Sequence, residues 1–167
     1  AIKRNGLRRV RQLVDRGLPV DSRNKTGWTP LLVAARDNQT NLALFLIERG
    51  ANVNAKAPRG DCDNLADASV LMVASAQGNL AVVDRLISSG ADVEASAFGC
   101  WTAIVHAATK GHLAIVRRLI TAGATGPENT WGWSLHRPAA NGHADLLHAL
   151  LDHIAALQAA EAEIERL

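Results

Sequence analysis

Three carboxylates lie close together in one short stretch of this 167-residue chain, where they could bind a hard cation such as calcium. The stretch reads PRGDCDNLADA and contains Asp61, Asp63 and Asp67. A calcium-binding loop has a glycine at its sixth position and a glutamate at its twelfth. Counted from Asp61, the sixth residue is not glycine and the twelfth is Met72. The spacing therefore argues against calcium and predicts an acidic surface loop.

Other residue types that could carry chemistry do not form a recognisable site. His148 and Asp152 are four residues apart and could share a metal ion, but the sequence offers no third ligand beside them. The two cysteines lack the spacing of a zinc site. The motifs of serine hydrolases, zinc proteases, phosphate-binding loops and dinucleotide-binding turns are absent from the sequence. We therefore expect no bound metal, no cofactor and no enzymatic activity.

Composition and charge limit the partners. Hydrophobic residues make up 48 % of the chain and charged residues 20 %, so it can bury a core. The net charge of +2 is too small by itself to indicate nucleic-acid binding, which we do not expect. The sequence contains no apolar run long enough to cross a bilayer, so we expect no membrane insertion. The N-terminal end is nonetheless rich in basic residues: Lys3, Arg4, Arg8, Arg9, Arg11, Arg16, Arg23 and Lys25.

The chain repeats itself along its length. Gly17, Gly50, Gly90 and Gly123 close successive units, at separations of 33, 40 and 33 residues, so the second unit carries extra residues. A period of this length is typical of a solenoid, in which each unit stacks on the next. The similar segments cover residues 27–54, 68–94, 100–124 and 132–151, preceded by a partial copy over residues 1–21.

Each unit carries the signals of two short helices. Thr29, Ser69 and Thr102 stand where a helix N-cap belongs, since a hydroxyl oxygen can accept an early backbone N–H. Pro30 follows at the first helical position, where its missing N–H costs little. Asn38, or a glycine in the later units, then interrupts the pattern before a second apolar helix. Neither helix can bury its apolar face alone, so neighbouring units must stack.

The recurring motifs identify a family resemblance. Thr29-Pro30-Leu31, Gly111-His112-Leu113 and the run GANVN from Gly50 to Asn54 match the pattern of the ankyrin repeat family, and related segments recur in order at this period. The chain resembles that family up to about Leu151. The resemblance implies an all-α solenoid of helix–turn–helix units separated by β-turn fingers. We expect a single domain over residues 1–167, with a partial repeat over residues 1–24 and repeats over about 25–57, 58–97, 98–127 and 128–167.

The two ends of the chain raise separate expectations. An ankyrin stack carries a capping helix ahead of its first full unit, so we expect further chain upstream of Ala1. A long capping helix without glycine or proline is predicted from about Ala144 to Leu167. Its apolar residues approach a heptad pattern, but Glu161 interrupts it. The helix is either a long cap with a solvated tail or a surface for self-association with a second chain.

The resemblance also places candidate binding residues. Trp28, Trp101 and Trp133 each precede the cap residue of their unit, and Ala68 takes this place in the second unit. In ankyrin repeats this position lies at the inner end of the finger and faces the concave groove, where tryptophan can serve as a binding hot spot. The alternative is that these rings pack between fingers. Residues that end the first helices should share the groove: Arg36, Asp37, Gln77 and Lys110.

We therefore expect a protein–protein interaction module that binds a partner protein through its concave groove and fingers. Asp61 and Asp63 of the acidic loop are candidate further contacts, and the alternative is that the loop is only a tolerated insertion. The alternative function is an inhibitor or protective protein that occludes an enzyme's active site. Cys62 and Cys100 lie in neighbouring fingers and either form a disulfide or stay reduced. A disulfide would indicate a periplasmic or secreted protein, whereas a cytoplasmic location is the default for an ankyrin module with few cysteines.

Overall fold

The computed structural model describes residues 2–59, 65–97 and 101–124, together with scattered helical residues between 145 and 159. Helix α1 is followed by three helix pairs, and no strand ladder occurs within these ranges. The predicted all-α repeat architecture is therefore confirmed. The helices are α1 (Ile2–Asp15), α2 (Pro30–Arg36), α3 (Thr40–Glu48), α4 (Val70–Ala76), α5 (Leu80–Ser88), α6 (Ala103–Thr109) and α7 (Leu113–Thr121).

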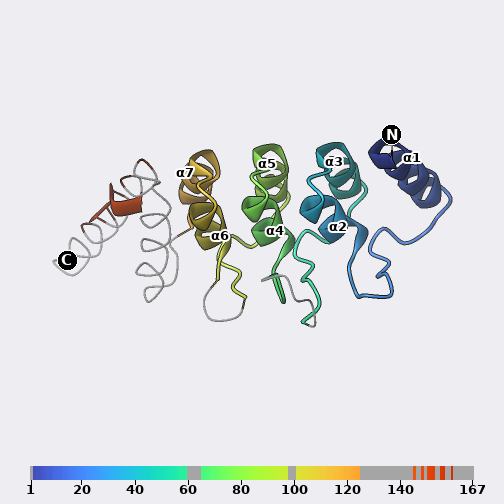
Figure 1. The fold of residues 1–167 in the computed structure, drawn as a ribbon, viewed down its shortest axis with the longest axis horizontal. Helices are drawn as coiled ribbons and strands as arrows, with labels where there is room; N and C mark the ends of the chain where they lie inside the picture. Colours follow the sequence, from blue (N-terminus) through green and yellow to red (C-terminus); the bar gives the residue numbers. More distant parts are fainter. Residues whose placement is uncertain are drawn as a thin grey trace.

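The helices form two rows (Figure 1). The inner helices α2, α4 and α6 stack on one another in one row, with α4 between the other two. The outer helices α3, α5 and α7 form the second row, and α1 continues that row at the N-terminal end. The loops that join consecutive units project past the inner row as the fingers. The first finger is residues 16–28, and the described parts of the second are residues 49–59 and 65–68.

The predicted helix boundaries are confirmed. The hydroxyl of Thr29 accepts a hydrogen bond from the backbone N–H of Leu32, and Pro30 takes the first position of α2. Ser69 caps α4 in the same way, whereas Thr102 holds the cap position of α6 without a side-chain hydrogen bond. Asn38, Gly78 and Gly111 separate the two helices of each pair with positive φ angles of 53°, 75° and 78°. The glycines that close the units, Gly17, Gly50, Gly90 and Gly123, have φ between 79° and 90°.

The core consists of aliphatic side chains that recur at equivalent positions. In the inner row Leu31, Leu71 and Ile104 are at most 2 % exposed. Small residues lie among them, because a short side chain allows the backbones of stacked helices to approach closely. The buried alanines of the inner row are Ala34, Ala35, Ala74, Ala107 and Ala108, and the fully buried residues of the outer row include Leu46, Leu86 and Leu119.

Polar side chains join each unit to the next at the turns between paired helices. The amide nitrogen of Asn79 donates to Asn38 Oδ1 (2.6 Å) and lies 2.7 Å from Thr40 Oγ1, both in the preceding unit. One unit later, His112 Nε2 lies 3.3 Å from the carbonyl oxygen of Ala76, to which it can donate. These bonds satisfy backbone and side-chain polar groups that the turns would otherwise leave unpaired.

The fingers are tied together by a second set of bonds. A carboxylate or amide oxygen at the end of one unit accepts a backbone N–H from the next: Asp21 accepts from Asn52, and Asn54 accepts from Asp92. The guanidinium of Arg23 and the ammonium of Lys56 reach backbone carbonyls of following fingers in the same manner. The fingers are therefore positioned by their neighbours as well as by the helices.

We predict that Gly78→Ala destabilises the chain more than Gly50→Ala. Both glycines have a positive φ, which costs an alanine about 1–2 kcal/mol. A Cβ on Gly78 would also lie 2.6 Å from the His112 ring, whereas one on Gly50 would meet nothing within 4 Å. Moving the ring would break its bond to Ala76. Urea denaturation followed by circular dichroism measures the two free energies of unfolding.

The same measurement in a His112→Ala background is the control. There the Gly78→Ala substitution should cost about as much as Gly50→Ala, because the obstructing ring is gone. Equal costs for the two glycines in the unmodified chain would contradict the close contact.

Candidate partner-binding surface

The ends of the inner helices form a continuous, partly exposed surface. At the C-terminal end of each inner helix, two consecutive residues are exposed or half-buried. Helices α2, α4 and α6 stack side by side (Figure 1), so the three pairs of residues lie at the ends of neighbouring helices. Gln77 and Lys110 are exposed, and the side chains of Arg36 and Asp37 are 36 % and 39 % exposed. We call this the inner-helix surface. It comprises Arg36, Asp37, Ala76, Gln77, Thr109 and Lys110.

Trp28 lies in the core and offers almost no surface to a partner. It is only 2 % exposed, and the guanidinium of Arg36 covers its ring at 4.8 Å from the centroid. Arg36 Nε in turn lies 3.1 Å from Asp37 Oδ1. Ala68, at the equivalent position of the second unit, is 1 % exposed. The position before the cap could either face a partner or pack inside the stack, and the burial of Trp28 and Ala68 matches packing. The group that covers the Trp28 ring on its outer side is the guanidinium of Arg36.

Trp101 is more accessible than Trp28. It is half-buried, and its ring centroid lies 5.1 Å from that of His106 on α6, at an interplanar angle of 47°. Position 106 is equivalent to Val33 and Val73 in the earlier units, so a histidine here replaces an aliphatic side chain. The difference follows from what covers each tryptophan, since the third unit has Thr109 where the first has Arg36.

The His106 side chain is buried and polar. It is 6 % exposed, and within the described part of the chain its Nε2 has no hydrogen-bond partner. Burial, and secondarily the charge of Lys110 one turn later, lower the pKa of His106 from 6.5 to about 4. The imidazole is therefore neutral near neutral pH, and protonation would place a charge inside the stack.

Several predicted site residues lie outside the described residues. They are Asp61, Cys62 and Asp63 of the acidic loop, Cys100, and Trp133 of the fourth unit. The contact and disulfide assignments for these residues remain predictions. Of the acidic loop the structure describes Asp67, which has a φ of 61° and a carboxylate oxygen 3.7 Å from the guanidinium of Arg59.

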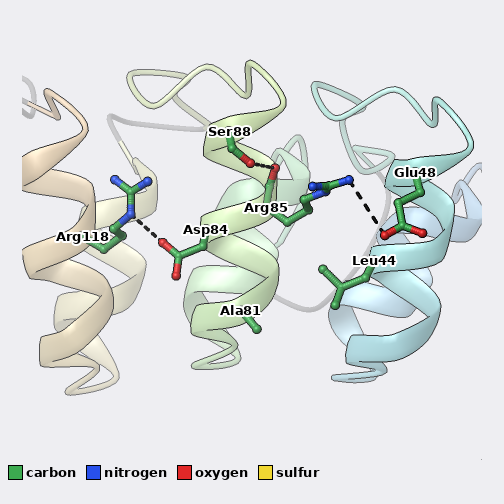
Figure 2. Close-up of a pocket in the computed structure, with 7 residues that line it drawn as sticks. All are labelled: Leu44, Glu48, Ala81, Asp84, Arg85, Ser88 and Arg118. Atoms are coloured by element: carbon green, nitrogen blue, oxygen red, sulfur yellow. Dashed lines mark hydrogen bonds and ion pairs between the residues drawn. The ribbon is translucent and has the colours of Figure 1, made fainter.

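The outer helices carry an open pocket that the sequence did not predict (Figure 2). Its volume is about 500 Å³, and it is lined by side chains of α3, α5 and α7. Arg118 pairs with Asp84 at 2.5 Å, and Arg85 lies 3.9 Å from Glu48, so each cation on its rim faces a carboxylate of the preceding outer helix. The pocket thus offers a ligand little unpaired charge, and we interpret the pairs as links between units. The lining residues are Leu44, Glu48, Ala81, Asp84, Arg85, Ser88 and Arg118.

Two further classes of site were sought among the described residues. No group of three His, Cys, Asp or Glu side chains in this part of the chain could hold a metal ion. No helix in the same ranges is long and apolar enough to cross a bilayer.

Comparison with known proteins agrees with the geometry. A family model described as ankyrin repeats (3 copies) matches residues 1–57 and 70–161. The chain belongs to the ankyrin repeat family. Ankyrin repeats are generally protein–protein interaction modules, and the family fold is a non-enzymatic interaction fold.

The chain is also similar to a named group of curated ankyrin proteins. It is 36 % identical over 103 residues to the ankyrin repeat, SAM and basic leucine zipper domain-containing protein 1 of Mus musculus, a match that covers 59 % of this chain and 20 % of that protein. The Homo sapiens protein of the same name is 35 % identical over 104 residues, with the same shares covered. The chain thus spans about a fifth of the length of these relatives.

We predict that His106→Val stabilises the ankyrin stack increasingly as the pH falls. The folded-state pKa of about 4 lies below the ordinary 6.5, so the unfolded chain binds the proton first. Stability is unaffected by this group above pH 6.5, falls between pH 6.5 and 4, and has lost about 3 kcal/mol below that range. Urea denaturation at several pH values measures the free energy of unfolding of wild type and variant. The titration of the carboxylates affects both proteins equally and cancels in the difference. A difference independent of pH would contradict the buried neutral histidine.

We predict a larger loss of stability for Trp28→Ala than for Trp101→Ala. Removing a fully buried ring should cost about 3–5 kcal/mol, whereas the half-buried ring loses fewer contacts. Thermal unfolding followed by circular dichroism compares the two variants. If Trp28→Ala left stability unchanged, the ring would belong to the exposed surface and not to the core.

Proposed function

We propose that this chain binds a partner protein through the inner-helix surface, together with the neighbouring fingers. The observation that carries the proposal is the contrast between equivalent positions of the three described units. The core residue two positions after the cap is Leu31, Leu71 or Ile104 in the three units, and these residues are alike in size and buried. The positions that end the inner helices differ in charge and shape from one unit to the next.

This contrast separates two kinds of constraint. Core positions repeat because each unit must pack against the same neighbouring geometry. The surface positions carry Arg-Asp, Ala-Gln and Thr-Lys in consecutive units, so they are not fixed by packing and can together match one irregular surface. Mixed charge of this kind suits a protein surface better than a uniformly charged phosphate backbone.

Part of the surface is held in place before any partner binds. Arg36 is fixed between the Trp28 ring at 4.8 Å and the carboxylate of Asp37 at 3.1 Å. A side chain already restrained loses less rotamer freedom on binding, which lowers the entropic cost of a contact. We therefore propose that Arg36, held over the Trp28 ring, is an anchor residue that contacts the partner.

The fingers extend the proposed surface. Trp101 is half-buried two residues before α6, and its ring lies 5.1 Å from that of His106 on this helix. Asp61, Asp63 and Trp133 remain proposed contacts from the sequence alone. The alternative role, occlusion of an enzyme's active site, gains no support from the described residues, and we do not pursue it.

A capture experiment with a matched control tests the proposal. Wild type and an Arg36→Ala, Gln77→Ala, Lys110→Ala variant are used as bait in an extract of the native source, and bound proteins are identified by mass spectrometry. We expect a partner that the wild type retains and the variant loses. None of the three side chains is buried, so circular dichroism should show an unchanged fold.

The control variant carries the same number and kind of changes on the outer row: Asn41→Ala, Arg85→Ala and Arg117→Ala, one exposed residue on each outer helix. It should retain the partner. Loss of the partner from both variants, or from the control alone, would show that the inner-helix surface is not the site.

A further inference from the structure

The charges of this chain are divided between its two parts. Residues 1–59 contain twelve Lys and Arg side chains against four Asp and Glu, a net charge of +8. Because the whole chain carries +2, residues 60–167 carry −6. The N terminus and α1 lie at one end of the stack (Figure 1), so much of the positive charge is at that end. Charge separated in this way produces a local field that the small net charge conceals.

Some of the basic side chains on this end are used inside the protein. The guanidinium of Arg11 lies 4.9 Å from the ring centroid of Phe45 on α3, and Arg49 covers the same ring at 4.7 Å. Asp15 then holds Arg49 through an ion pair of 2.7 Å. These contacts link α1 to α3 and account for two of the arginines.

Other arginines at the N-terminal end have no such role. Arg9 and Gln12 lie on α1, and Arg16 directly follows it, with its backbone N–H still bonded to the Gln12 carbonyl as in a helix. The three residues therefore share one face at i, i+3, i+7 spacing, over about 10 Å. All three are exposed, whereas Val10 and Val14 on the other side of the helix pack against the core. In the part of the chain that the structure describes, no carboxylate forms an ion pair with Arg9 or Arg16. We call these three residues the arginine row.

We propose that the arginine row is a second docking surface, which binds an acidic segment of a partner protein. A guanidinium can accept a carboxylate in a bidentate geometry, and two of them on one helix face can engage carboxylates of a single segment. The arginine row lies on α1 and the residue that directly follows it, at the N-terminal end of the outer row of helices, so it is separate from the inner-helix surface. Each exposed contact is weak, and the attraction falls with salt, so the row mainly guides and orients the partner.

A protein segment suits the row better than a nucleic acid. Asp15 and Asp21 are exposed on the same N-terminal end and interrupt the positive surface along which a continuous phosphate backbone would have to run, whereas a short acidic segment need contact only the arginine row. Single-stranded nucleic acid also stacks its bases on accessible aromatic rings. The rings in this region, Trp28 and Phe45, are 2 % and 8 % exposed and are covered by arginines.

The test measures binding of a short fluorescent polyglutamate peptide by anisotropy, with polyglutamine of the same length as the neutral probe. In an Arg9→Gln, Arg16→Gln variant we expect about tenfold weaker binding of polyglutamate at low ionic strength, since two charged contacts are lost. Glutamine keeps the helix propensity and removes the charge. The control variant, Arg85→Gln with Arg117→Gln, removes the same charge from α5 and α7 and should bind within about twofold of wild type.

Each other outcome overturns the proposal in a distinct way. Equal losses in both double variants would mean that only net charge matters, and no binding of polyglutamate would mean that the row does not accept carboxylates. Tighter binding of oligothymidylate, also lost in Arg9→Gln, Arg16→Gln, would assign the row to nucleic acid. Oligomers in sedimentation that this variant abolishes would assign it to a second copy.

The proposal can fail independently of the proposed function. The Arg36→Ala, Gln77→Ala, Lys110→Ala variant should bind polyglutamate as the charge-matched control does, while losing the partner of the inner-helix surface. Loss of polyglutamate binding in that variant, with retention in Arg9→Gln, Arg16→Gln, would move the acidic-segment site to the inner row.

Discussion

The units of this chain bury their apolar side chains against one another as well as within themselves, and the rest of the structure depends on that stacking. Helix α4 has only seven residues, yet Val70, Leu71, Met72, Val73 and Ala74 are all at most 1 % exposed. A helix of two turns cannot bury all its faces within one helix pair, so the burial requires α2 on one side and α6 on the other. Alanine at the repeated positions keeps those helices close.

Stacking also determines which polar groups must be satisfied between units. The turns before α5 and α7 end in Asn79 and His112, whose side chains reach the preceding unit, and the fingers exchange backbone N–H groups with side-chain oxygens of their neighbours. On the outer row, Asp15, Glu48 and Asp84 each meet an arginine of the following unit. Individually such exposed ion pairs contribute little, but together with the buried contacts they set the register of one unit on the next.

The positions along the chain differ in how strongly stacking restricts their residue type. At core positions such as Leu31, Leu71 and Ile104 the residue type is similar in each unit, whereas the positions that face solvent on the inner row vary from unit to unit. Arg36 combines both roles, since it covers a core tryptophan and presents an ordered guanidinium. At the N-terminal end, Arg11 covers Phe45, while Arg9 on α1 and Arg16 directly after it are exposed to solvent. Arginine can do both because the flat face of its guanidinium packs on an aromatic ring while the N–H groups at its edge stay available for hydrogen bonds.

The sequence by itself determined the fold, the helix boundaries and the repeat family, because these depend on local signals that recur at a fixed period. Thr29 and Ser69 cap helices, Pro30 begins one, and the closing glycines have positive φ, as their types alone predict. Only the tertiary structure decided how accessible each side chain is. Trp28 and Trp101 precede equivalent caps, yet one lies under Arg36 and is buried while the other lies beside His106 and is half-exposed. The physical reason is that exposure depends on side chains that lie turns or whole units away in sequence, and no local pattern specifies them.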